Sequence, residues 1–149
     1  MKLYAFASNN LTNIWAGVGA GKWAVAPSSD ATFSKTRVTK AKRMPVGAFG
    51  ILYCVQTRSF TVPFVIYSGV AETIVRDIWP EPWVLPFSMK ALGTPQRQMS
   101  REQAGVLLPS VRGGRIGLTK LIPVPATFAF NGSEVGDDDW AVLVRELAT

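Results

Sequence analysis

Two runs of β-forming residues constrain the fold more than any other feature. Ile51–Val55 and Val62–Tyr67 are rich in aliphatic and aromatic residues, and only the six residues Gln56–Thr61 separate them. Runs of this composition favour strands, and a connection this short joins neighbouring antiparallel strands. The sequence therefore predicts a β-hairpin over residues 51–67.

Other segments extend this hairpin into a sheet with short helices. Ser100-x-x-Gln103 is a capping box, so a helix should begin there and end at Pro109. Three acidic residues, Asp137–Asp139, precede the last helix, where the helix dipole favours negative charge. The other predicted strands are Leu3–Ala7, Val84–Leu92, Ile116–Ile122 and Ala126–Phe130, with a turn at Asn131-Gly132; the predicted helices are Leu11–Val18, Ser100–Leu108 and Trp140–Leu147, and Ala31–Lys42 is either a helix or a loop.

The pattern predicts a single α+β domain over residues 1–149, with an open β-barrel or twisted mixed sheet flanked by short helices. Pro86 places the strand over 84–92 at a sheet edge or at a bulge, because proline donates no ladder hydrogen bond. No apolar run reaches the roughly 18 residues that a membrane helix needs, and the N-terminus lacks a signal-peptide pattern. The single Cys54 lies in an apolar run. We therefore expect a buried thiol and a cytoplasmic protein with no membrane partner.

The residue inventory argues against an enzyme. The chain has no His and one Cys, which excludes histidine acid–base chemistry, a Ser-His triad and an ordinary Cys/His zinc site. The run GVGAGK resembles a phosphate-binding loop, but Ala16 replaces the first Gly and Trp23 replaces the final Ser or Thr. The acidic triplet is typical of a helix cap rather than of a metal site. We therefore expect no catalytic residue, no metal and no cofactor.

The N-terminal segment carries the features that indicate a ligand. Three amides, Asn9, Asn10 and Asn13, follow the first predicted strand, and Trp23 stands among small residues shortly after them. An amide that reads the edge of a base, beside an aromatic face on which the base stacks, is what binding of an unpaired nucleobase requires. The alternative is that Asn9 and Asn10 cap a short helix and Trp23 belongs to the core.

This segment resembles the YTH domain, the reader of N6-methyladenine in the PUA-like superfamily, which also includes the EVE domains. The matching elements are Ser8-Asn9-Asn10, then Asn13, then Gly21-Lys22-Trp23-Ala24, with nearly the family's spacing. The resemblance implies a PUA-like fold in which Asn13 contacts the ring edge of the methylated adenine, with Asn9 nearby. It also implies that Trp23 forms one wall of an aromatic cage and that the main-chain carbonyl of Ala24 accepts the N–H of the methylated amine.

A second match lies in IWPEPWVLPFSMKALG, residues 78–93. Trp83-Val84-Leu85-Pro86 and Ala91-Leu92-Gly93 are similar to family motifs in which the Trp and the Leu complete the cage, although the segment between them is shorter here. Alternation from Trp83 to Met89 is equally typical of a strand. In that case Trp79, on a loop stiffened by two prolines, would be the second wall. The loop position favours Trp79 and the sequence match favours Trp83, so both are candidates, together with Leu92.

The charge balance favours a polyanionic partner. The chain has 16 Lys and Arg against 10 Asp and Glu, a net charge of +6, which is typical of nucleic-acid binding. The resemblance implies a phosphate-binding Lys before the Ser-Asn segment, but that position is Ala7 here, so phosphate contacts must be arranged differently. The candidate phosphate-binding residues are Lys35, Arg37, Lys40, Lys42 and Arg43, for which a solvated face is the alternative, and Arg112 and Arg115, which stand among glycines.

Together these features predict a non-catalytic domain that binds a methylated base in DNA or RNA, with the base flipped or unpaired. The resemblance favours N6-methyladenine, whereas EVE-like relatives include readers of cytosine. Such a domain could target a modification-dependent restriction system, whose NTPase or nuclease would be a fused domain or a separate chain. The alternative is a PUA-like RNA- or protein-interaction domain without methyl-base recognition. The two differ in whether Trp23 and Trp79 or Trp83 face each other across a cavity with Asn13 at its floor.

Overall fold

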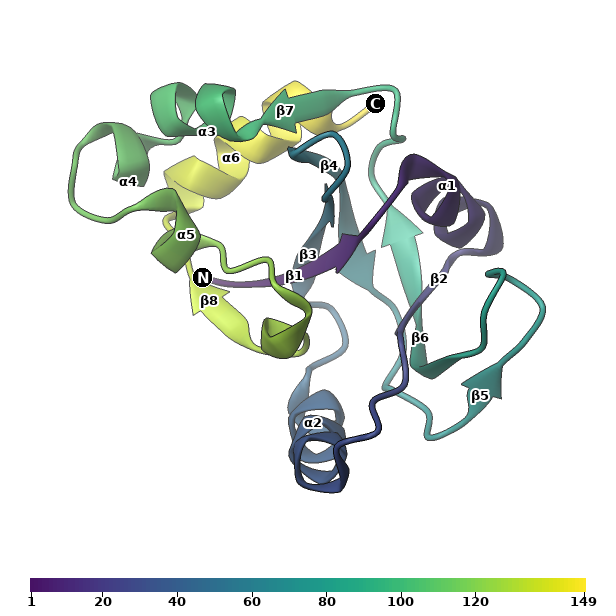
Figure 1. Ribbon diagram of the computed structural model, residues 1–149. Helices are drawn as coiled ribbons and strands as arrows, with labels where there is room; N and C mark the ends of the chain where they lie inside the picture. Colours follow the sequence, from purple (N-terminus) through teal and green to yellow (C-terminus); the bar gives the residue numbers. More distant parts are fainter.

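The computed structural model describes residues 1–149 as one mixed sheet that curls into a half-barrel, with short helices around it (Figure 1). The strands are β1 (Lys2–Ser8), β2 (Lys22–Val25), β3 (Phe49–Cys54), β4 (Ser59–Ile66), β5 (Ile74–Val75), β6 (Trp83–Ala91), β7 (Gln98–Ser100) and β8 (Gly132–Glu134). The helices are α1 (Leu11–Ala20), α2 (Ala31–Arg43), α3 (Arg101–Leu107), α4 (Pro109–Arg112), α5 (Leu118–Leu121), the 3₁₀ turn η1 (Ala126–Phe128) and α6 (Asp137–Leu147). No helix is both long enough and apolar enough to cross a membrane.

The order of strands across the sheet is β2-β6-β4-β3-β1-β8, and β5 and β7 pair with β6 and β4. β1 and β3 are parallel, with Leu3 opposite Phe49, whereas the other pairs are antiparallel. Parallel neighbours need a long crossover between them. Here residues 9–48 form it and contain α1, β2 and α2, so the segment that carries the amides and Trp23 is fixed at both ends to the middle of the sheet.

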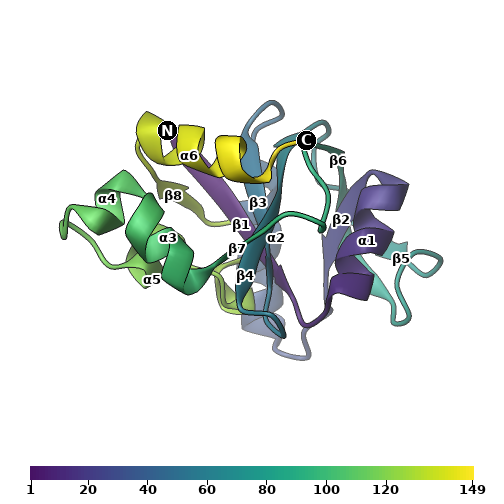
Figure 2. The same ribbon diagram turned by 90° about the horizontal axis from the view of Figure 1, so that it is seen from above.

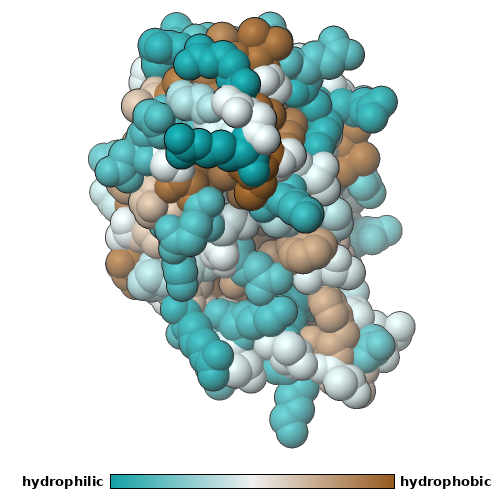
Figure 3. All heavy atoms as spheres, turned by 90° about the vertical axis from the view of Figure 1, so that its left-hand side faces the viewer, coloured by the Kyte–Doolittle hydropathy of each residue, from teal (hydrophilic) through white to brown (hydrophobic).

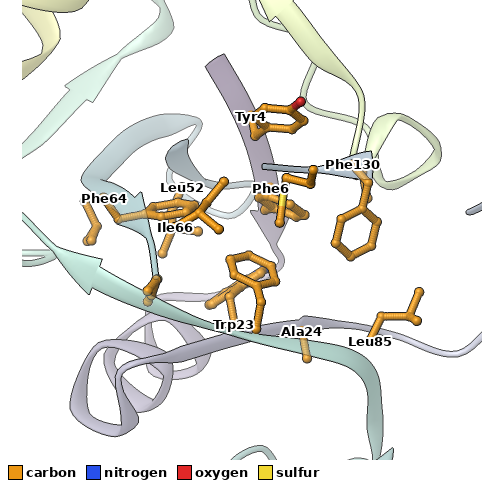
Figure 4. Packing of buried hydrophobic residues seen from close by; sticks show 14 of the residues in the cluster. Tyr4, Phe6, Trp23, Ala24, Leu52, Phe64, Ile66, Leu85 and Phe130 are labelled. Atoms are coloured by element: carbon orange, nitrogen blue, oxygen red, sulfur yellow. The ribbon is translucent and has the colours of Figure 1, made fainter. Parts of the chain in front are cut away.

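Alternating side chains divide the core into two layers. In β1, Tyr4 and Phe6 belong to one buried cluster while Leu3 and Ala5 belong to the other, as the two-residue period of a strand requires. The first cluster fills the inside of the curl, where Phe6 lies among Trp23, Phe64 and Phe130 (Figure 4). The second lies under α3 and α6, which gather on one side of the sheet, with α1 on the other side (Figure 2).

The elements with strong local signals are confirmed. β3 and β4 form the expected hairpin, and Cys54 at the end of β3 is buried. The Ser100 side chain accepts from the N–H of Gln103 and caps α3, which ends before Pro109. The segment 31–43 is a helix rather than a loop, and the acidic residues stand in the first turn of α6.

Two predicted strands are wrong. Ile116–Ile122 contains the short helix α5, and Ala126–Phe130 contains the turn η1. In the first, Leu121 and Ile122 are buried while Thr119 and Lys120 are exposed, which is a one-sided helical pattern rather than alternation. Pro123 and Pro125, which precede the second, donate no ladder hydrogen bonds.

Pro86 lies at a bulge, one of the two positions expected for it. β6 is interior, between β2 and β4, so the edge-strand alternative is wrong. The register runs from Trp23↔Phe87 to Val25↔Val84, so two residues of β6 oppose one residue of β2. Leu85 has φ 58°, outside the strand region, which accommodates the extra residue.

Candidate nucleic-acid interface

A hollow of about 420 Å³ lies where β1 ends and α1 begins. Its other walls come from β2, from the loop that contains Pro80 and Glu81, and from the segment around η1. Its volume is in the range of about 300 to 1,000 Å³ that is typical of small-molecule sites. A single base with its sugar is a suitable size of occupant.

The asparagines divide between a structural role and the hollow. The Asn10 side chain accepts a hydrogen bond from the N–H of Asn13 at 2.9 Å and caps α1, so one part of the helix-cap interpretation is correct. Asn9 and Asn13 also line the hollow. The side-chain amide of Asn13 forms no hydrogen bond within the protein, so it is available to a ligand.

Trp23 lies deep in the wall of the hollow. It is 1% exposed and belongs to the core cluster inside the curl, as the core interpretation of this residue expects. Gly21 ends α1 in the left-handed conformation (φ 66°) and turns the chain into β2. A Cβ at Gly17 would lie 2.8 Å from the Trp23 ring, so a glycine there lets α1 pack directly on the indole.

Three indoles form one packed cluster at this wall. The rings of Trp79 and Trp83 stack at 4.4 Å and 21°, and Trp23 meets them edge-on at 5.7 and 5.5 Å. A base held between two parallel rings needs them about 7 to 8 Å apart, because each contact takes about 3.5 to 4.0 Å. The tryptophans therefore stand together as the cage hypothesis requires, but they contact each other rather than facing across a gap.

Trp83 lines the hollow, whereas Trp79 lies behind it. Trp79 is 3% exposed, and its indole N–H donates to the main-chain carbonyl of Asn13 at 2.9 Å. This bond anchors the loop to α1 and leaves the amide of Asn13 free. Trp83, half-buried at the start of β6, is the better-placed second wall, so the preference for Trp79 from its loop position does not match the geometry.

Ala24 also lines the hollow and lies in the bulge opposite Leu85 and Pro86. It has no register partner between the Trp23 and Val25 pairs. A main-chain carbonyl at this position suits the acceptor role that the resemblance implies. Leu92 is elsewhere: it follows the far end of β6, where its carbonyl accepts from the N–H of Thr149, and it does not line the hollow.

Helix α2 places its basic residues on different faces. Lys35, Lys42 and Arg43 are exposed and Lys40 is partly exposed, with Lys42 paired to Glu72 at 2.9 Å. Arg37 alone is buried and lines the hollow. Burial lowers the pKa of its guanidinium from the ordinary value. The expected basic cluster is therefore four surface cations and one internal one.

Arg112 and Arg115 lie apart from the hollow. Arg112 ends α4 and Arg115 is in the loop that follows, and both are exposed. Neither lines the hollow. Figure 3 shows the face of the molecule that carries α3 to α5. Hydrophilic and hydrophobic side chains are mixed on this face. The candidate phosphate contacts therefore form two separate regions.

Ser8 is a site residue that sequence reasoning did not select. In the whole chain two buried side-chain polar atoms lack a hydrogen-bond partner, Ser8 Oγ and Arg37 Nε, and both residues line this hollow. Unpaired buried polar groups are rare in proteins and point to a missing partner. The signal in the sequence is that Ser8 is a polar residue directly after the apolar run Leu3–Ala7. The wall from Val124 to Ala129 had no local signal.

Comparisons with known proteins identify the fold. No family model matches the chain, and no curated protein matches it. Solved structures do: the YTH domain of Pho92 in complex with m6A has a TM-score of 0.60 and 14% identity, and the match covers 97% of this chain and 84% of that one. The Toxoplasma CPSF4 YTH domain in apo form gives 0.59 and 14%, covering 99% and 88%. The YTH domain of Zygosaccharomyces rouxii MRB1, in complex with N6-methyladenosine RNA, gives 0.52 and 17%, covering 73% and 68%. The chain has a YTH-like fold.

Proposed function

We propose that this chain is a non-catalytic reader of a methylated base in RNA, with N6-methyladenine as the base. The observation that carries the proposal is the hollow itself. It brings together Asn13, Trp23, Ala24 and Trp83, and it contains Ser8 with its unpaired buried hydroxyl. Two structures of the same fold, those of Pho92 and MRB1, were solved with N6-methyladenosine or RNA that contains it, which supports this choice of ligand.

The chemistry of the walls suits a methylated adenine. The free amide of Asn13 and the hydroxyl of Ser8 can donate to and accept from the ring edge, and the Ala24 carbonyl can accept from the N–H of the methylated amine. The methyl group adds apolar surface that gains from contact with indole rings. Stacking is worth about 1 to 3 kcal/mol per base, which is enough to discriminate once the hydrogen bonds are made.

Binding requires the indole cluster to open. Trp83 is partly exposed whereas Trp23 is buried, so Trp83 is the ring that can turn and admit a base. Trp79 is held by its hydrogen bond to Asn13 and stays behind the wall. We expect binding to change tryptophan fluorescence, because the stacked Trp79–Trp83 pair separates.

Single-stranded RNA is the favoured polymer. A base within duplex DNA must be flipped out at a cost of a few kcal/mol, whereas an unpaired base in RNA avoids that cost. Targeting of a restriction NTPase or nuclease would instead require a preference for methylated DNA. A binding assay with both RNA and DNA strands therefore separates an RNA reader from a restriction-targeting domain.

The test is fluorescence anisotropy at a fixed, near-physiological salt concentration with matched RNA and DNA strands that carry N6-methyladenine, 5-methylcytosine or no modification. We expect methyladenine RNA to bind at least about ten-fold tighter than plain RNA, a difference of about 1.4 kcal/mol. Trp83→Ala should lose this preference. Trp15→Ala is the matched control, because Trp15 is 45% exposed on α1 and does not line the hollow.

Other results would redirect the proposal. Equal weak binding of every strand would indicate a PUA-like interaction domain without methyl-base recognition. Tighter binding of methylated DNA would support targeting of a restriction system. Loss of the methyl preference in Trp15→Ala would place the base outside the hollow.

A further inference from the structure

Arg37 differs from the other basic residues of α2 in being internal. It is 7% exposed, whereas Lys35, Lys42 and Arg43 on the same helix are exposed. Its position one turn past Phe33 brings the guanidinium carbon to 5.2 Å from the centre of that ring, so the two side chains make a cation–π contact. A buried arginine is almost always paired, which makes its partners the next question.

No carboxylate neutralises Arg37. Nη1 donates to the carbonyl of Ala26 at 3.0 Å, and Nε is buried without any partner. Glu81 is the one acidic residue that lines the hollow, and it forms no ion pair with Arg37. Glu72 lines a second hollow together with Arg37, but its carboxylate is paired with Lys42 instead. A buried charge without a counter-charge is costly, and arginine stays protonated in proteins, so the cost is not removed by losing the proton.

The position of Arg37 connects two spaces. It lines the hollow described above and also a second hollow of about 290 Å³, whose polar lining residues are Ser28, Ser34, Thr73 and the Glu72 that is paired with Lys42. An anion bound at Arg37 would therefore have the bound base on one side and the side chains of Ser28 and Thr73 on the other, because the Ser34 hydroxyl already donates to the carbonyl of Ser28.

The geometry points to Arg37 as an anion subsite that binds a phosphate of the same nucleotide whose base enters the hollow. The inference rests on the proposed function for the base, and it adds the group that the strand backbone supplies. A guanidinium is a donor only, with a planar fork that matches phosphate oxygens. The guanidinium therefore suits a phosphate of the nucleic-acid backbone. It does not suit the methylated amine of the base, which is itself a hydrogen-bond donor.

Four ligands test this assignment, with affinities measured by calorimetry at constant ionic strength: adenosine, N6-methyladenosine, and the 5′- and 3′-monophosphates of N6-methyladenosine. For the wild-type chain we expect one monophosphate to bind about ten-fold tighter than the nucleoside. Arg37→Gln should remove most of that difference and keep binding of the nucleoside. Arg145→Gln is the matched control and should keep it, because Arg145 is an exposed arginine on α6 that lines neither hollow.

Three results would overturn the subsite: no preference for either monophosphate in the wild-type chain, a preference retained in Arg37→Gln, or an equal loss in Arg145→Gln. If Arg37→Gln does not fold by circular dichroism, the Nε–H resonance of Arg37 in the wild-type chain, assigned with Arg37→Lys, replaces it. That resonance should shift with the monophosphate and not with the nucleoside. A shift with neither ligand, or with both equally, would overturn the subsite.

The same ligands separate the two proposals. The comparison of adenosine with N6-methyladenosine tests recognition of the methyl group and does not involve the phosphate. A phosphate effect through Arg37 without a methyl effect would contradict the reader function and keep the anion subsite. A methyl effect without a phosphate effect would do the reverse.

Discussion

At the scale of single residues, Trp23 serves both the core and the hollow. It is 1% exposed and packs against Trp79, Trp83 and the backbone of α1. Removing a buried tryptophan typically costs about 3 to 5 kcal/mol. Because the total stability of such domains is about 5 to 15 kcal/mol, we expect Trp23→Ala to destabilise the fold markedly, with a clearly lower denaturation midpoint in urea.

Trp15→Ala is the control for that measurement. Trp15 is exposed on the same helix that packs on Trp23, and a surface substitution usually changes stability by about 0.5 kcal/mol or less. Equal midpoints for the two variants would contradict the structural role of Trp23. It follows that Trp83→Ala, at a half-buried position, is the better variant for testing methyl recognition.

At the scale of elements, helix α2 presents cations to solvent on the side away from Arg37. Exposed cations near a bound strand contribute through counterion release, which is independent of the base. We expect the double variant Lys35→Gln, Arg43→Gln to bind methylated and plain RNA more weakly by the same factor. The slope of log affinity against log salt should fall by about 0.7 for each phosphate that the variant no longer neutralises.

A pair of equal charge elsewhere provides the comparison for α2. Lys120→Gln with Arg145→Gln removes two exposed cations from α5 and α6. An unchanged salt slope in the α2 variant, or an equal fall in both variants, would show that α2 is not the phosphate track.

The elements also show which parts of the fold the sequence predicts. Ser100 with Gln103 and the three acids at the start of α6 are local signals. In the structure Ser100 caps α3, and Asp139 in the first turn of α6 accepts from the N–H of Gly136. β3 and β4 are recognisable because each strand pairs with the other and only a short connection separates them in sequence. The segment 116–130 is different, because its apolar residues pack in short turns whose burial depends on distant strands. Its β-rich composition alone therefore misled the prediction.

At the scale of the whole molecule, the site was only partly visible in the sequence. Asn13, Trp23 and Ala24 lie close together in sequence within the crossover between β1 and β3, so their closeness in space could be predicted. Trp83 arrives through pairing of β6 with β2. The burial of Arg37 and the wall from Val124 to Ala129 depend on how α2 and the η1 segment pack, which no local pattern encodes.

The whole molecule also separates two basic regions, which predicts a dependence on strand length. Helix α2 lies away from α4, which ends at Arg112 (Figures 1 and 2), and neither Arg112 nor Arg115 lines the hollow. A strand of about 4 nucleotides, the lower end of common site sizes, should occupy the hollow alone, whereas about 16 nucleotides can extend over the surface. We expect Arg112→Gln with Arg115→Gln to leave anisotropy binding of the short methylated strand unchanged and to weaken binding of the long one. Weaker binding of the short strand would show that these arginines contact the nucleotide in the hollow. Unchanged binding of both the short and the long strand would show that they do not contact the phosphates.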